Sequence, residues 1–369
     1  MNLEPVVYFN HHDFTGTTMR LQLLALGALL GTTLASPGDQ LGEFAECKEA
    51  CEHYRLCPNS EIDMLSKDNR FQGTIFSSTP TLLKHFLVWD CVSDCDYQCQ
   101  QIVTHMRMQQ GEPFLQFHGK WPFKRLLGMQ EFFSTIFSIG NFIPHYRGYR
   151  KLQELLRKAQ RGGNKAQIVL LQNYIYVTIA GMIAWSASTV FHLRDRPFTE
   201  KMDYFWAGGT VISAFHAISI RVTRFDKRPQ LARIFSIAIG IIFALHVLRL
   251  AIQWSYAYNM RFNVAFGILQ YILVFVLSYQ NYRSLQQIKK NRNLSHKVFV
   301  RRVYALCVQP LLLVLITSLA MSLELFDFFS YTYQIDAHAI WHLATIWPSW
   351  VLYDFLLADF NHVTRGSLD

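Results

Sequence analysis

Long apolar stretches alternate with short polar ones along the last two thirds of this chain. Each stretch approaches the ~20 residues that a helix needs to cross the ~30 Å hydrocarbon core of a bilayer. They lie at residues 126–146, 168–191, 203–221, 234–254, 262–282, 303–324 and 338–359. In lipid every backbone polar group must be satisfied within its own element. The pattern therefore predicts an all-α membrane protein with seven transmembrane helices.

A shorter apolar stretch lies near the N-terminus, at residues 21–34. It is too short to span a bilayer as a helix, it follows Arg20, and small residues precede Ser36. This arrangement is typical of a cleaved signal peptide, so we assign residues 1–35 to a signal region. A signal peptide normally begins with basic residues, whereas two acidic residues lie upstream of this stretch. We therefore expect translation to start at Met19. The alternative is a buried helix of a soluble domain.

Six of the seven cysteines crowd into one short region behind this segment. They are Cys47, Cys51, Cys57, Cys91, Cys95 and Cys99. An even number of closely spaced cysteines in a secreted segment indicates disulfides, and six allow 15 pairings. Zinc ligation by these cysteines is the alternative. We expect a small disulfide-rich lumenal domain at residues 36–120, because domains of this size often need cross-links.

Composition agrees with a chain whose solvent is partly lipid. Of its 369 residues 51% are apolar and only 17% are charged, against a usual charged share of about 25%. The values exclude disordered, collagen-like and coiled-coil proteins. The net charge of +9 is compatible with nucleic-acid binding or with loops that face the cytosol.

The positions of Lys and Arg decide between these two interpretations. The loops after the first, third and fifth stretches hold seven, five and seven basic residues, counting Arg221 at the end of the third stretch, whereas the other three loops together hold four. Basic loops stay in the cytosol, so the N-terminus is expected in the lumen and the tail at 361–369 in the cytosol. The charge then sets orientation, and no nucleic-acid partner is expected.

A few polar residues inside the predicted spans are candidates for chemistry, because ionisable groups at membrane depth are costly and usually functional. Three spans bring five of them to the lumenal side: Ser188, His192, Asp203, His338 and His342. Three imidazoles are a natural zinc set that leaves one position for water, and zinc lowers the pKa of that water. Asp203 could act as the general base, and Ser188 could donate a hydrogen bond to the developing oxyanion.

Other interpretations compete with a metal site. A lone His or Ser in a span usually makes helix–helix contacts. A nucleophilic triad with Ser188 attacking and His192 as base is the enzymatic alternative, but it leaves His338 and His342 without a role. Glu131, in the lumenal third of the first span, is a possible accessory residue that orders the site or binds a second cation. His246 is another, through contact with a lipid phosphate.

The motif set resembles the CREST superfamily of seven-span hydrolases, which includes alkaline ceramidases. It comprises Ser188-x-x-x-His192, Asp203 and His338-x-x-x-His342. The Cys-rich domain, followed by Trp121-Pro122-Phe123 and Gly128-Met129-Gln130-Glu131, is similar to the post-GPI-attachment-to-proteins factor three family. The resemblance assigns residues 121–360 to a hydrolase domain.

This resemblance implies a phospholipase A2 of the endoplasmic reticulum membrane. Such an enzyme removes the sn-2 acyl chain of GPI-anchored proteins, which makes those proteins and their lipid the expected partners and one zinc ion the expected cofactor. A ceramidase-like amide hydrolase is an alternative of the same fold. A non-enzymatic seven-span receptor or chaperone for GPI-anchored cargo is an alternative of another class, which absence of zinc and of lipid hydrolysis would favour.

Overall fold

The computed structural model describes residues 36–58, 68–292, 294–323 and 327–365. The predicted signal region at 1–35, with Met19, lies outside these residues. The chain divides into two compact units, which are considered separately. The N-terminal unit continues to Phe132, past the expected boundary at residue 120, and takes in the segment Phe329–Asp336. The remaining described residues form the helical unit.

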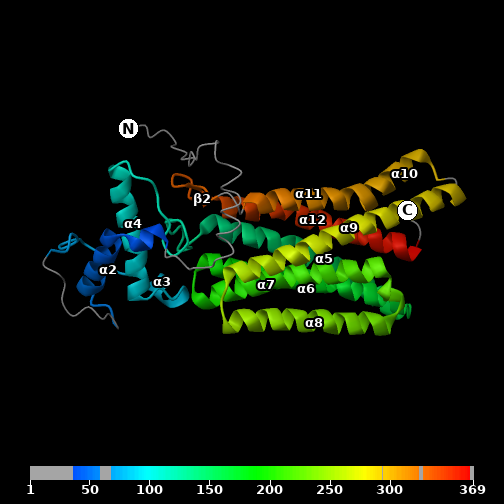
Figure 1. Cartoon of the computed structure of the whole chain (residues 1–369), viewed down its shortest axis with the longest axis horizontal. Helices are drawn as coiled ribbons and strands as arrows, with labels where there is room; N and C mark the ends of the chain where they lie inside the picture. The colour runs from blue at the N-terminus through cyan, green and yellow to red at the C-terminus, as the bar shows by residue number, and fades with distance from the viewer. Residues whose placement is uncertain (1–35, 59–67, 293, 324–326, 366–369) are drawn as a thin grey trace. The chain divides into compact units, whose positions relative to one another are not determined.

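Two helices, α2 (Gly42–Tyr54) and α4 (Cys91–Gln109), form the centre of the N-terminal unit and are blue and cyan in Figure 1. The 3-10 turn η2 (Pro37–Gln40), the short helix α3 (Thr81–Phe86) and a hairpin of β1 (Phe329–Ser330) and β2 (Ile335–Asp336) complete it. The hairpin strands are antiparallel, with Phe329 opposite Asp336. The hairpin stacks on this unit, because the rings of Trp121 and Phe329 lie 5.5 Å apart.

Three disulfides join α2 and its C-terminal extension to α4. The pairs are Cys47–Cys99, Cys51–Cys95 and Cys57–Cys91, with Cα–Cα distances of 5.6, 5.6 and 5.4 Å. Cys47 and Cys51 are one turn apart on α2, as Cys95 and Cys99 are on α4, so two antiparallel helices are cross-linked turn by turn. The expected disulfide framework is confirmed, and zinc ligation by these cysteines is wrong because their sulfurs are bonded to one another.

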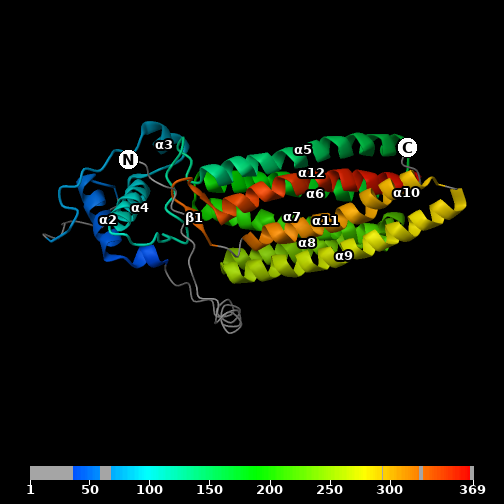
Figure 2. The same ribbon diagram turned by 90° about the horizontal axis from the view of Figure 1, so that it is seen from above.

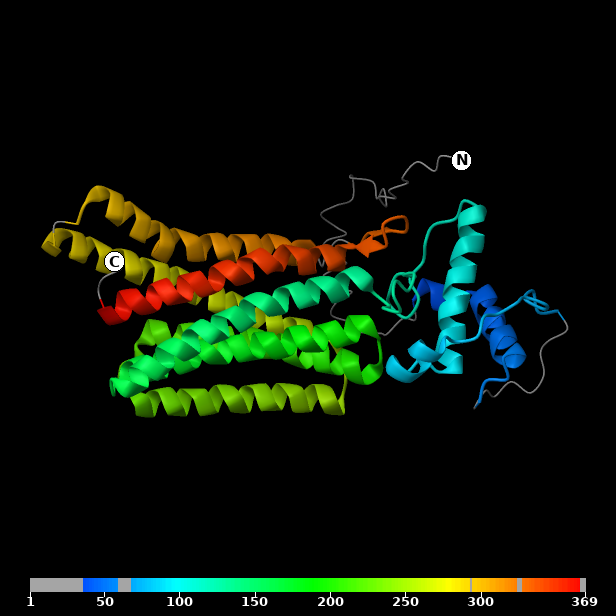
Figure 3. The ribbon, with the colours of Figure 1, turned by 180° about the vertical axis from the view of Figure 1, so that it is seen from behind.

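Long helices joined by short connections form the helical unit, and Figures 2 and 3 show them side by side. Among the described residues they are α5 (Phe132–Arg161), α6 (Lys165–Leu193), α7 (Pro197–Thr223), α8 (Pro229–Ile252), α9 (Tyr256–Arg292), α10 (His296–Val303), α11 (Gln309–Ser322) and α12 (Ala337–Arg365). The 3-10 turn η3 (Phe225–Lys227) precedes α8. The π-helical segment η4 (Tyr304–Val308) joins α10 to α11 without a break. Short connections between α5 and α6, α6 and α7, α7 and α8, and α8 and α9 make these sequence neighbours antiparallel.

Four helical segments are long and apolar enough to cross a membrane by length and composition. They are Lys165–Leu193, Pro229–Ile252, Tyr256–Asn291 and His296–Ser322. The helix at Pro229–Ile252 lies at the edge of the bundle (Figures 1 and 3) and exposes a row of apolar side chains, among them Ile241, Leu245 and Leu248. A continuous apolar surface of this kind is suited to a lipid environment.

The helix α5, which corresponds to the first expected span, begins at Phe132 and not at residue 126 as the hydropathy pattern predicted. Residues Leu126 and Met129 instead close a tight turn, in which Leu127 and Gly128 have positive φ angles. A helix cannot pass through two such residues. At its other end α5 continues to Arg161, so the basic residues expected in a loop are helical.

A buried ion pair joins four helices far along the bundle from the start of α12. Arg221 of α7 donates two hydrogen bonds to Asp359 of α12, at 2.6 and 2.9 Å. Tyr174 of α6 and Asn281 of α9 donate to the same carboxylate at 2.9 and 3.0 Å. Asp359 is completely buried, and these donors satisfy the charge that burial would otherwise make costly.

Candidate metal centre

Three histidine side chains from two helices converge in the helical unit. His192 lies in the last turn of α6, and His338 and His342 lie in the first two turns of α12. The Nε2 atom of His338 is 3.4 Å from that of His192 and 3.0 Å from that of His342. His192 and His342 are almost completely buried. The expected pairing of two i, i+4 histidines with a third from a distant span is therefore present.

This donor set fits a metal ion. One ligand atom from each of the three histidines lies within 4.8 Å of the others, and converging imidazole nitrogens are ligands that zinc prefers. Two of them come from successive turns of one helix, so their separation is fixed by backbone geometry. The three histidines expected to bind zinc thus form a group that could hold a metal ion, and the ion itself belongs to the proposal below.

Ser138 of α5 fixes the orientation of one of these imidazoles. Its hydroxyl donates to the carbonyl oxygen of Ser134 at 2.7 Å and lies 2.9 Å from Nδ1 of His342. A serine hydroxyl has a single hydrogen, so Ser138 accepts from His342. That imidazole then carries its hydrogen on Nδ1, so that Nε2 is the atom with the lone pair that a metal ion requires.

A second residue of α5 holds the backbone of α12 at His342. Asn141 is completely buried and donates from Nδ2 to the carbonyl oxygen of His342 at 2.7 Å. The indole of Trp185 packs edge-on against the His342 ring, with centroids 5.3 Å apart. The sequence reasoning missed Ser138 and Asn141, because they lie on a third helix and share no motif with the histidines. Their polar side chains within an apolar stretch were the available signal.

Ser188 and Asp203 lie on the wall of one cavity with His342. The Ser188 hydroxyl is buried, 3.1 Å from that of Ser138. Because the Ser138 hydroxyl donates its only hydrogen to the Ser134 carbonyl, the Ser188 hydroxyl donates to the Oγ atom of Ser138. His192 meanwhile directs Nε2 toward His338. These contacts do not favour a triad in which His192 activates Ser188.

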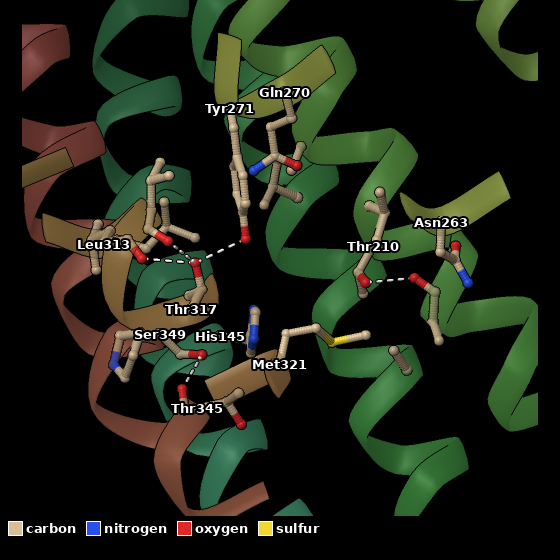
Figure 4. A pocket seen from close by; sticks show the side chains of 18 of the residues that line it. His145, Thr210, Asn263, Gln270, Tyr271, Leu313, Thr317, Met321, Thr345 and Ser349 are labelled. Atoms are coloured by element: carbon tan, nitrogen blue, oxygen red, sulfur yellow. Dashed lines mark hydrogen bonds between the residues drawn. The ribbon is translucent and has the colours of Figure 1, made fainter. Parts of the chain in front are cut away.

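The cavity has a volume of about 390 Å³ and is mostly apolar. It extends from Trp341 to Leu356 along α12, which is about 22 Å of helix at 1.5 Å per residue. Figure 4 shows its interior, where Tyr271 and Thr317 are joined by a 2.9 Å hydrogen bond. His145 also lines it, held by Tyr353 and by the indole of Trp185. A long apolar ligand suits this shape.

The two accessory candidates are not among the residues that line this cavity. Glu131 is buried in the N-terminal unit, immediately before α5, and forms an ion pair with Lys120. His246 is buried on α8, where it stacks on Phe262 with ring centroids 3.6 Å apart and lies beside Gly208 of α7. The structure therefore brings His192, His338, His342 and Ser188 into one hydrogen-bonded group with Ser138, with Asp203 on the adjoining cavity wall.

Comparison with known proteins gives a consistent answer over nearly the whole chain. The model of the Per1-like family matches residues 81–360. The chain is 56% identical to Protein PER1 of Saccharomyces cerevisiae over 332 residues, 89% of this chain and 93% of the yeast protein. It is 30% identical over 355 residues to a human protein named GPI-specific phospholipase A2-like PGAP3, 96% of this chain and 98% of the human protein. No solved structure matches the chain.

Proposed function

Since the chain belongs to the Per1-like family, we propose that it remodels GPI-anchored proteins by hydrolysing the sn-2 acyl ester of their lipid. The convergence of three imidazoles beside a long apolar cavity carries this proposal. The names of animal relatives, GPI-specific phospholipase A2-like, agree with it. The partners are GPI-anchored proteins and their lipid.

His192, His338 and His342 would hold one zinc ion. When bound, zinc polarises an ester carbonyl and lowers the pKa of water. The Nδ1–H of His342 remains bonded to Ser138, and such partners of ligating histidines fix the tautomer and strengthen the ligand. Asn141 keeps the first turns of α12 in place through the His342 carbonyl.

Asp203 and Ser188 supply acid–base and electrostatic assistance. The carboxylate of Asp203 accepts a proton from water as the water oxygen bonds to the acyl carbon. The bond from that carbon to the sn-2 oxygen then breaks, and the proton passes to the glycerol oxygen, which yields a fatty acid and a lyso lipid. Ser188 donates to the developing oxyanion by turning its O–H away from Ser138.

The apolar cavity receives the acyl chain that is to be removed. Its lining continues for about 22 Å along α12, which is comparable with an extended long-chain acyl group. A chain that moves from lipid into this cavity gains no hydrophobic free energy, because lipid tails are already apolar. Selection among acyl chains therefore rests on the shape of the cavity.

The bundle spans the endoplasmic reticulum membrane with the histidine cluster on the lumenal side. The supporting observations are the four apolar helices and the excess of Lys and Arg in alternate connections. This orientation places the disulfide-rich unit in an oxidising compartment, as its three disulfides require. Protease protection in sealed microsomes tests it, with one tag just after the expected signal region and another at the C-terminus: only the C-terminal tag should be digested.

The proposal is tested by lipid analysis of GPI anchors in cells that lack the endogenous protein. His338→Ala should leave the original sn-2 chain in place, and the purified variant should lose bound zinc. His296→Ala is the control, because His296 is exposed at the start of α10, outside the cluster. Normal remodelling by the His338 variant, at equal expression, would refute the proposed function.

A further inference from the structure

The helix α3 is unusual because it buries none of its residues. Leu82 and Phe86, one turn apart, are 65% and 78% exposed. Val88, just after the helix, is exposed as well. Apolar side chains in contact with water carry a free-energy cost, so a helix that displays them on a disulfide-bonded unit indicates that something covers them.

A turn nearby displays two more leucines. Leu126 and Met129 exchange backbone hydrogen bonds of 3.2 and 3.0 Å, and the central residues Leu127 and Gly128 have φ angles of 52° and 83°. Positive φ at both centres defines a type I′ turn, whose first central position favours Asn, Asp or Gly. Here that position holds a leucine that is 86% exposed.

The turn and the helix are neighbours within the N-terminal unit. A Cβ atom on Gly128 would lie 2.5 Å from Leu83 and 3.4 Å from Leu87, so the turn packs directly on α3. We call Leu82, Phe86, Val88, Leu126 and Leu127 the apolar patch.

Arg125 anchors this region to the rest of the unit. It donates to Asp94 of α4 at 2.7 Å, and its guanidinium lies 3.7 Å from the centre of the Tyr97 ring. The disulfides fix α4 in turn. The patch is therefore carried on a rigid support.

Backbone geometry and charge both distinguish the patch from ordinary surface. Val88 has a φ of 53°, a conformation that β-branched residues rarely adopt. Such strain persists where the position serves a function. The segments 81–88 and 124–129 contain basic residues, among them Lys84 and Lys124, and no acidic residue. Apolar side chains with a basic border suit a phospholipid surface.

We propose that the apolar patch inserts into the lumenal phospholipid surface of the membrane that holds the bundle. This inference rests on the membrane orientation in the proposed function. Five residues lead from Leu127 to Phe132, where α5 begins, so the turn lies within about 18 Å of that helix end. The leucine and phenylalanine side chains enter the boundary between headgroups and acyl chains, and Lys84 and Lys124 meet phosphates. The N-terminal unit is thereby held at headgroup level.

Depth-dependent fluorescence quenching on the full chain tests the proposal. In a Cys307→Ala background, single cysteines replace Phe86 or Leu127 and carry an NBD label. The protein is reconstituted into phosphatidylcholine vesicles that contain a nitroxide lipid with its spin label near the headgroup. Ile75→Cys is the matched control, because Ile75 is 95% exposed in the same unit but lies outside the patch.

The labels at 86 and 127 should be quenched strongly and emit at shorter wavelength, and the label at 75 should not. Quenching at 86 and 127 no greater than at 75 would overturn the proposal, as would shielding that appears only when a GPI-anchored protein is added. Lipid hydrolysis is measured on the same samples. An active protein with unquenched labels removes the docking proposal alone, whereas an inactive protein with quenched labels counts against the proposed function alone.

A further variant separates membrane contact from folding. Leu127→Asn places a favoured residue at the first centre of the type I′ turn, so the N-terminal unit should remain folded. With one apolar anchor removed, quenching of the label at 86 should decrease. Loss of folding in Leu127→Asn would show that this leucine supports the unit itself and would contradict the proposal.

Discussion

The Oγ atom of Ser138 lies 2.9 Å from Nδ1 of His342, although 204 residues separate them along the chain. The hydroxyl gives its own hydrogen to the Ser134 carbonyl, so it can only accept from the imidazole. This contact places the hydrogen of His342 on Nδ1, so that the Nε2 lone pair is directed toward His338. Ser138 is a positioning residue that acts on the candidate metal centre through His342.

Ser138→Ala should therefore weaken zinc binding by about 10–100-fold, the usual effect of removing a hydrogen-bond partner of a ligating histidine. Titration of the purified protein with zinc measures this change. Ser134→Ala is the matched control, because Ser134 is buried one turn away and its hydroxyl has no hydrogen-bond partner. Ser138→Thr, which keeps the hydroxyl, should restore part of the affinity. Equal affinities of the Ser134 and Ser138 alanine variants would contradict this role.

The buried Arg221–Asp359 pair should be a major determinant of bundle stability. Asp359→Ala leaves Arg221 buried without its main acceptor, which costs about 3–5 kcal/mol. Thermal unfolding in detergent should show a large decrease in Tm.

Asp354 provides the comparison on the same helix. Its carboxylate is 64% exposed and lies 3.8 Å from Lys151, and exposed pairs contribute up to about 1 kcal/mol. Asp354→Ala should accordingly change Tm little. If the two alanine variants were equally stable, the network that joins α6, α7, α9 and α12 would not be a stabilising element.

Close packing between α5 and α6 depends on the absence of a side chain at Gly181. A Cβ atom there would collide with the ring of His145, which is held by Tyr353 and Trp185. Overpacking of this kind costs about 1–3 kcal/mol, so Gly181→Ala should lower Tm. It should also alter the cavity wall.

Gly240→Ala is the control for intrinsic helix propensity. An added Cβ on Gly240 of α8 would meet no atom within 4 Å, and alanine is favoured over glycine in a helix by about 1 kcal/mol. Its Tm should stay the same or rise. A rise for Gly181→Ala as well would show that His145 can move aside without cost.

The stability of the N-terminal unit should depend on pH through His118. Its hydrogen bond to Asp96, at 2.9 Å, outweighs partial burial and raises the pKa of His118 above its usual value. Asp39 adds a favourable charge 3.2 Å from the ring. Folding therefore favours the protonated ring. This contribution is complete below the unfolded pKa of about 6.5 and is lost as the pH rises through the raised folded value.

The unit should accordingly be more stable near pH 6 than near pH 8, by a modest amount because the ring is over half exposed. Burial tends to raise the pKa of Asp96, but His118 and Lys48 outweigh it and lower that pKa. Its contribution is therefore lost only under acid conditions. The measurement is the difference in Tm between the wild type and His118→Gln across this pH range. A difference that is independent of pH would disprove the linkage.

Particular residues show how far sequence reasoning reached. The regular spacing of His338 and His342 predicted a shared helix face, because four residues are about one helical turn. The start of α5 at Phe132 differs from the sequence estimate for a local reason, because a turn with positive φ angles precedes it. Ser138 could not be assigned, because its role exists only when α5 lies against α12.

The sequence by itself determined the helical class, the apolar segments, the presence of disulfides and the three histidines, because periodicity, hydropathy and residue type are properties of local stretches. Only the tertiary structure decided which cysteines pair, which serine orients His342, and that Arg221 and Asp359 meet in the core. It also placed the turn that contains Leu127 and Gly128 beside α3. These contacts join segments far apart in the chain, and their geometry follows from how whole helices and turns pack.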